Sequence, residues 1–104
     1  MTEARIIISR IKGDFVKENK ITELTIQSVP DFGKFGKLEC TVQCNDESQT
    51  KGTWQLNAQS NNALIKKFGK QTEAWVARKV PVLTHEYDSG IGINVDEKKL
   101  EGTL

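Results

Sequence analysis

The residues best suited to chemistry lie in the short stretch DFGKFGK, at positions 31–37. It interleaves Phe32 and Phe35 with Lys34 and Lys37, and glycines separate the pairs. Proteins that hold single-stranded nucleic acid combine basic side chains, which contact phosphates, with aromatic rings, on which bases stack. The alternative for each ring is structural, because a phenylalanine in such a loop can also fold back as a lid over a hydrophobic core.

Polar side chains continue from this loop onto a predicted strand face. In KLECTVQCN, residues 37–45, apolar and polar residues alternate, which is the pattern of a half-buried strand. TWQLN, residues 53–57, repeats the alternation and adds Gln55 to the polar face. The candidate nucleic-acid-binding residues are Phe32, Lys34, Phe35, Lys37, Thr41, Gln43, Gln55, Arg78, Lys79 and Tyr87.

Five strands and one helix have to position these side chains. Alternating or β-branched residues bounded by turn signals predict strands at 21–29, 37–45, 53–57, 79–87 and 90–95. Between the third and fourth strands, SNNALIKKFG, residues 60–69, has helical periodicity. We expect Ser60 or Asn61 to cap the start of this helix and Gly69 to end it.

This order of elements is that of the OB-fold, a small, partly open Greek-key barrel of five strands. We therefore expect a mainly β, OB-fold-like barrel with one helix between strands three and four. A single domain would span residues 1–104, with 1–20 and 96–104 peripheral to the barrel. Leu64, Ile65 and Phe68 would turn from the helix into one barrel end. An SH3-like barrel is the main competitor, but that fold would not contain a helix at this point.

The two tryptophans are better assigned to the core than to a binding surface. Trp54 alternates with Leu56, which places it on the apolar face of its strand. Trp75 follows Thr72, which we expect to cap a short helical turn. We predict that its ring packs beneath the helix, where a buried indole stabilises the fold by a few kcal/mol, in order of magnitude.

Catalytic and metal-binding functions find little support. The chain has one histidine, no Gly-x-Ser-x-Gly, no Gly-rich phosphate loop and no carboxylate pair at a telling spacing. We expect no enzymatic activity, no cofactor and no metal. Cys40 and Cys44 would lie roughly 13 Å apart along a strand. A disulfide requires Cα atoms within about 7 Å, so the sequence predicts two buried free thiols.

Charge and hydropathy indicate in which cellular compartment the protein acts. The formal net charge is +1, but residues 60–80 hold five basic residues and one acidic residue. Residues 81–104 hold five acidic residues and two lysines. No apolar run approaches the roughly 20 residues that span a bilayer, and the N-terminal residues lack the pattern of a signal peptide. We expect a soluble, cytoplasmic protein.

The helical stretch carries a resemblance to a known family. Its motif residues here are Leu56, Asn57, Ser60, Asn61 and Leu64, followed by Phe68, Gly69, Thr72, Trp75, Val76, Arg78 and Val80. In this pattern the chain resembles small single-domain proteins common in phages and in microbial genomes that carry viral genes. The spacing between LN and SN is one residue longer than in the family. The resemblance covers about residues 14–95, and it implies an OB-like barrel and a role near phage DNA metabolism, without a catalytic activity.

Two functions follow as hypotheses from these observations. The first is non-catalytic binding of single-stranded DNA or RNA, based on the strand order and the aromatic and basic loop. The alternative is a protein–protein adaptor that docks onto a replication or recombination protein. The adaptor hypothesis is favoured by the scarcity of aromatic residues on the predicted strand face.

Overall fold

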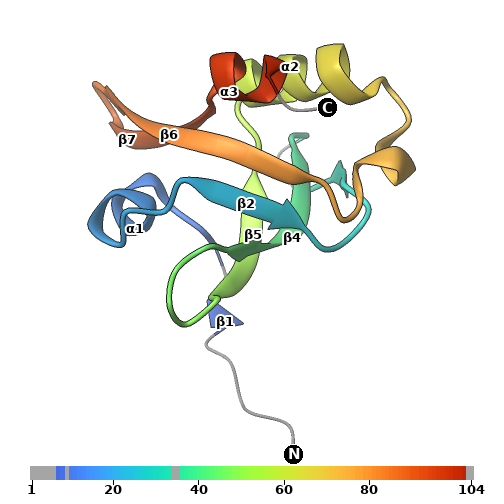
Figure 1. Ribbon diagram of the computed structural model, residues 1–104. Helices are drawn as coiled ribbons and strands as arrows, with labels where there is room; N and C mark the ends of the chain where they lie inside the picture. Colours follow the sequence, from blue (N-terminus) through green and yellow to red (C-terminus); the bar gives the residue numbers. More distant parts are fainter. Residues whose placement is uncertain (1–6, 9, 34–35, 103–104) are drawn as a thin grey trace, which may run out of the picture.

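The fold is mainly β and consists of short strands and short helices (Figure 1). The computed structural model describes residues 7–8, 10–33 and 36–102, with only the backbone of 7–8. The strands are β1 (Ile7–Ile8), β2 (Glu23–Ile26), β3 (Asp31–Phe32), β4 (Leu38–Cys44), β5 (Lys51–Gln55), β6 (Lys79–Tyr87) and β7 (Gly90–Val95). The helices are α1 (Gly13–Glu18), α2 (Ala58–Phe68) and α3 (Glu97–Glu101), with a 3₁₀ helix η1 (Thr72–Trp75).

The described strands form one sheet in the order β1-β5-β4-β2-β6-β7, and β3 pairs with β4. The β1–β5 pair is parallel, and the other pairs are antiparallel. The chain passes from β2 to β4 to β5 and then returns through α2 and η1 to place β6 beside β2. This is a Greek-key connection, in which a fourth strand lies next to the first. Within the described ranges β5 and β7 do not pair, so the sheet does not close into a barrel.

The mainly β class is confirmed, and the five predicted strands are present as β2, β4, β5, β6 and β7, with α2 between the third and the fourth. The structure adds β1, β3, α1 and α3, and its sheet is open, so the predicted five-stranded barrel is not confirmed. The predicted cap of the long helix was wrong. α2 begins at Ala58, and the Asn57 side chain accepts a hydrogen bond from the Ser60 backbone N–H at 2.9 Å. Thr72 was also wrong as a cap, because Gln71 occupies that position and its side chain makes no capping bond. Gly69 does end α2, with a φ of 90° that favours glycine.

The apolar strand faces pack into one core together with both tryptophans. Trp54 is 1% exposed and Trp75 is 0% exposed, which confirms that both rings are buried. Leu64 is fully buried on α2, whereas Ile65 and Phe68 are partly buried and pack against the core. The core therefore lies between the sheet and the inward side of α2.

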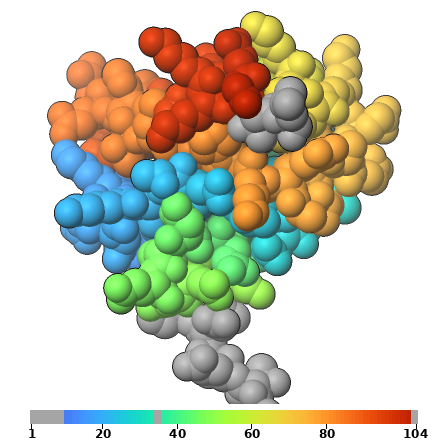
Figure 2. Space-filling model, in the orientation of Figure 1, coloured from blue at the N-terminus to red at the C-terminus, as the bar shows by residue number. Residues whose placement is uncertain are grey.

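Both end segments contribute to this core in their described parts. Ile11 and Val16, from the N-terminal segment, are buried, and so is Leu100 on α3. The expectation that these segments are merely peripheral therefore does not hold for those three side chains. Asp96 caps α3 by accepting a hydrogen bond from the Lys99 backbone N–H at 3.3 Å. In Figure 2 α3, in red, lies on the surface across β6, in orange, and beside α2, in yellow.

The two cysteines are free and buried, as predicted. Burial raises the pKa of the Cys40 thiol to about 12. Burial, with the nearby Asp46 carboxylate, raises the pKa of Cys44 to about 12 as well. Both thiols therefore stay protonated at neutral pH, and a protonated thiol is neither a nucleophile nor a metal ligand.

Candidate nucleic-acid interface

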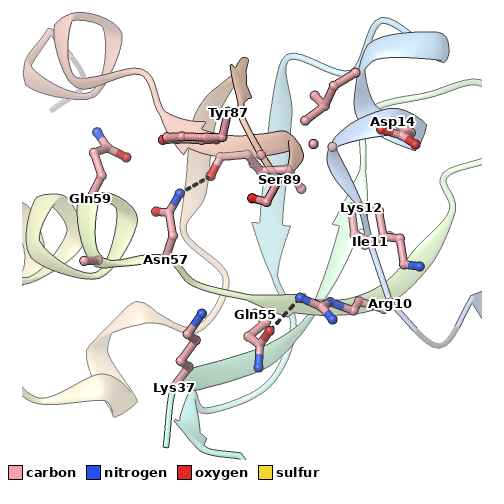
Figure 3. Close-up of a pocket in the computed structure, with 16 residues that line it drawn as sticks. Arg10, Ile11, Lys12, Asp14, Lys37, Gln55, Asn57, Gln59, Tyr87 and Ser89 are labelled. Atoms are coloured by element: carbon pink, nitrogen blue, oxygen red, sulfur yellow. Dashed lines mark hydrogen bonds between the residues drawn. The ribbon is translucent and has the colours of Figure 1, made fainter. Parts of the chain in front are cut away.

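A cavity of about 600 Å³ lies where β5 and β7 fail to pair (Figure 3). Its walls come from residues 10–14, from Lys37 and Gln55, from the first residues of α2, and from the hairpin that joins β6 to β7. The cavity thus collects side chains from segments far apart in the sequence. It has the size of a small-molecule pocket.

Side chains from the start of α2 bridge the gap at one end of the cavity. Asn57 Nδ2 donates to the Ile93 carbonyl at 3.1 Å and to Asn94 Oδ1 at 2.8 Å. The Gln59 amide makes a reciprocal pair with Val95, donating to its carbonyl at 3.0 Å and accepting from its N–H at 2.9 Å. These bonds satisfy backbone groups of β7 that a neighbouring strand would otherwise pair.

The N-terminal segment lies along the other wall. The Ile11 N–H donates to the Thr53 carbonyl at 2.7 Å, which continues the contact of β1 with the edge of β5. Gly13 packs so closely on β7 that a Cβ there would lie 2.1 Å from the Ile91 carbonyl oxygen. The side chains of Arg10 and Lys12, on either side of buried Ile11, are exposed at the cavity.

Positive charge predominates in the lining. The lining contains three cationic side chains, those of Arg10, Lys12 and Lys37, and one carboxylate, that of Asp14. Arg10 Nη2 donates to Gln55 Oε1 at 2.6 Å, which orients the Gln55 amide. Figure 3 shows Asp14 on the far side of the cavity from Lys37 and Gln55. The cavity therefore favours an anionic group near Lys37 and Gln55.

The Tyr87 ring is held in place at the wall of the cavity opposite Lys37 and Gln55. Its hydroxyl hydrogen-bonds to Asn94 Oδ1 at 2.9 Å. Its ring lies close over Gly92, where a Cβ would be 2.7 Å from a ring carbon, and meets His85 edge-on with centroids 4.5 Å apart. Nevertheless 43% of the residue is exposed. A ring held on several sides and still accessible is well prepared for stacking, because little conformational entropy remains to be lost.

The structure brings together three of the predicted residues, Lys37, Gln55 and Tyr87, at this cavity. Thr41 and Gln43 lie on the outward face of β4, next to Thr53 and Lys51 on β5. Their face adjoins Gln55, but neither side chain lines the cavity.

The other predicted residues lie away from the cavity or outside the described ranges. Phe32, on β3, is 72% exposed, so the lid alternative is wrong for this ring. Arg78 donates to the Ala74 carbonyl and lies over the Phe68 ring at 5.4 Å, and Lys79 is exposed at the start of β6. Lys34 and Phe35 lie outside the described residues.

Arg10 and Lys12 line the cavity but were not among the predicted binding residues. Their signal was period-two alternation around Ile11 in the segment SRIKGD, since an extended segment turns such residues to one side. Residues 10–12 come just before α1, and no strand was predicted over them.

Comparison with protein-family models, with curated proteins and with solved structures gives no match. Across the described residues, no group of three or more His, Cys, Asp or Glu side chains is arranged to hold a metal ion. None of the helices described is both long enough and apolar enough to cross a membrane.

Proposed function

We propose that this chain is a non-catalytic protein that binds single-stranded nucleic acid, DNA in the first instance, on an OB-like fold. The observation that carries the proposal is the cavity beside β5, where an accessible aromatic ring and three cationic side chains surround a polar strand end. Binders of single strands combine these two kinds of group, basic for the backbone and aromatic for the bases.

The strand order supports the OB-like assignment. In OB-folds the ligand lies on strands two and three, between the loop joining strands one and two and the loop joining strands four and five. Counting β2, β4, β5, β6 and β7 as the five strands, the corresponding surface is β4–β5 with the β6–β7 turn. Gln55 on β5 and Tyr87 at that turn both line the cavity. The open seam between β5 and β7 fits a fold that is often only partly closed.

The test is titration of a fluorescently labelled dT oligonucleotide with protein, read by anisotropy at low salt. Non-specific binding has a Kd of about 1–100 µM near physiological salt, and we expect this range there and tighter binding at low salt. No anisotropy change at protein concentrations well above that range would contradict the proposal. A partner protein that stays bound after nuclease treatment would then favour the adaptor function.

The salt dependence of binding should report how many cationic side chains of the cavity neutralise the nucleic-acid backbone. Single strands give a slope of about −0.7 per phosphate in log K against log salt. If Arg10, Lys12 and Lys37 each bring one positive charge to the backbone, the expected slope is about −2. In a Lys37→Ala variant it should fall in magnitude by about 0.7. An unchanged slope in this variant would show that Lys37 does not contact the backbone.

Tyr87→Ala should weaken oligonucleotide binding by about 1–3 kcal/mol, the range for one stacked base. Tyr87→Phe should retain most of the affinity, because the ring remains over Gly92. The matched control is Leu83→Ala, since Leu83 is 41% exposed on the same strand but does not line the cavity. Equal effects of Tyr87→Ala and Leu83→Ala on affinity would argue against stacking on Tyr87.

A further inference from the structure

The side-chain amides of the cavity lining already use their oxygen atoms as acceptors within the protein. Asn57 Oδ1 accepts from the Ser60 N–H, and Gln59 Oε1 accepts from the Val95 N–H. Gln55 Oε1 accepts from Arg10. The side-chain amide oxygens of the lining are therefore all occupied within the protein.

The Asn57 and Gln59 amides already donate to residues of β7, but the donors of Gln55 and of the basic side chains remain available. Gln55 uses only its oxygen, so its Nε2 group has no partner among the described residues, and the same holds for the amines of Lys12 and Lys37. Arg10 spends one of its five N–H groups on Gln55. Such a set of donors, most of them charged, matches a group that only accepts hydrogen bonds and carries negative charge. Phosphate is such a group.

The donors and the aromatic ring occupy different sides of the cavity. In Figure 3 Arg10, Gln55 and Lys37 lie along one side, and Tyr87 lies across from them. A ligand that satisfies both sides has an anionic end and a flat ring. The volume of about 600 Å³ falls within the range for small-molecule ligands.

Building on the proposed function, we infer that the cavity holds one whole nucleotide unit, with its phosphate at Arg10, Lys37 and Gln55 and its base on Tyr87. A free nucleoside monophosphate therefore binds here without the rest of a strand. The β4–β5 face then serves the neighbouring nucleotides, and this cavity fixes their position.

The experiment compares thymidine 5′-monophosphate with thymidine and with inorganic phosphate, by calorimetry and by NMR shifts of the intact protein at low salt. The monophosphate is expected to bind at least about tenfold more tightly than either fragment, since a charge-assisted hydrogen bond or a stacked ring each supplies that factor. Shifts should gather at Tyr87, Gln55 and the Gly92 amide. Equal affinity for the monophosphate and for either fragment would overturn the inference.

A matched pair of variants tests the donor side. Gln55→Glu puts a carboxylate among the donors and should weaken monophosphate binding about tenfold or more. Gln71→Glu changes the net charge equally on an exposed residue outside the cavity and should change affinity less than about twofold. If Gln55→Glu lowers the melting temperature too far for binding measurements, Lys37→Ala replaces it as the test variant, because Lys37 is exposed and its truncation should leave the fold intact. Equal loss in both glutamate variants, or full binding by Lys37→Ala, would contradict the assigned phosphate position.

The oligonucleotide titration separates this inference from the proposed function. Binding of the dT oligonucleotide without binding of the monophosphate would leave the function standing and remove the one-nucleotide cavity. Binding of the monophosphate without the oligonucleotide would support the cavity as a nucleotide site and overturn strand binding. Binding of neither would overturn both.

Discussion

A Trp75→Ala variant is expected to lose about 3–5 kcal/mol of folding free energy, the range for truncating a buried tryptophan. The indole is fully buried, and its Nε1 donates to the Gly69 carbonyl at 2.9 Å. The ring therefore fills the core and also ties η1 to the end of α2. Since domains of this size unfold with about 5–15 kcal/mol, the melting temperature should fall by more than about 10 °C. Urea and thermal unfolding followed by circular dichroism measure both quantities.

Trp54 provides the control for the hydrogen bond. It is buried as deeply, but its Nε1 has no hydrogen-bond partner among the described residues. Phenylalanine at either position removes part of the ring and the N–H. At Trp75 the change also breaks a bond, so Trp75→Phe should cost about 1 kcal/mol more than Trp54→Phe. Equal costs would show that the bond to Gly69 contributes no net stability.

The elements predicted correctly are those whose signal is local. Along β4 every second side chain is apolar, and the observed burial alternates in the same register. The core position of Trp54 followed from its alternation with Leu56, and both are buried. Gly69 ended α2 as expected because a left-handed φ penalises any other residue. In each case neighbours within a few positions decide the conformation.

The cavity was only partly predictable because distant residues build it. Asn57 has a side chain suited to polar contact on the strand face. Instead it caps α2 and donates hydrogen bonds to Ile93 and Asn94, which are distant in the sequence. Nothing in the sequence near Asn57 specifies those partners. Tyr87 was placed correctly near the β6–β7 turn, but its packing over Gly92 depends on the antiparallel register of the hairpin. Arg10 and Lys12 reach the cavity because their segment continues from β1 along the same edge of β5.

The contact between α1 and β7 should be the most sensitive to a single methyl group. A Cβ at Gly13 would lie 2.1 Å from the Ile91 carbonyl oxygen and 2.5 Å from its carbon. Both obstacles are backbone, so a side-chain rotation cannot relieve them, and α1 must move away from β7. Such a move would expose Val16, now 1% exposed. Gly13→Ala is therefore expected to cost at least about 3 kcal/mol, the upper part of the range for overpacking.

Gly102→Ala is the matched control for this change. A Cβ at Gly102 would meet its nearest neighbours at 3.7 and 3.8 Å, an ordinary contact, and its φ of −77° suits alanine. The control should melt at or slightly above the wild-type temperature. Because residues 10–14 line the cavity, Gly13→Ala should also weaken oligonucleotide binding at temperatures where the variant stays folded. A Gly13→Ala protein that melts and binds like the Gly102→Ala control would show that α1 does not pack against β7, and the cavity would then lack the wall that carries Arg10 and Lys12.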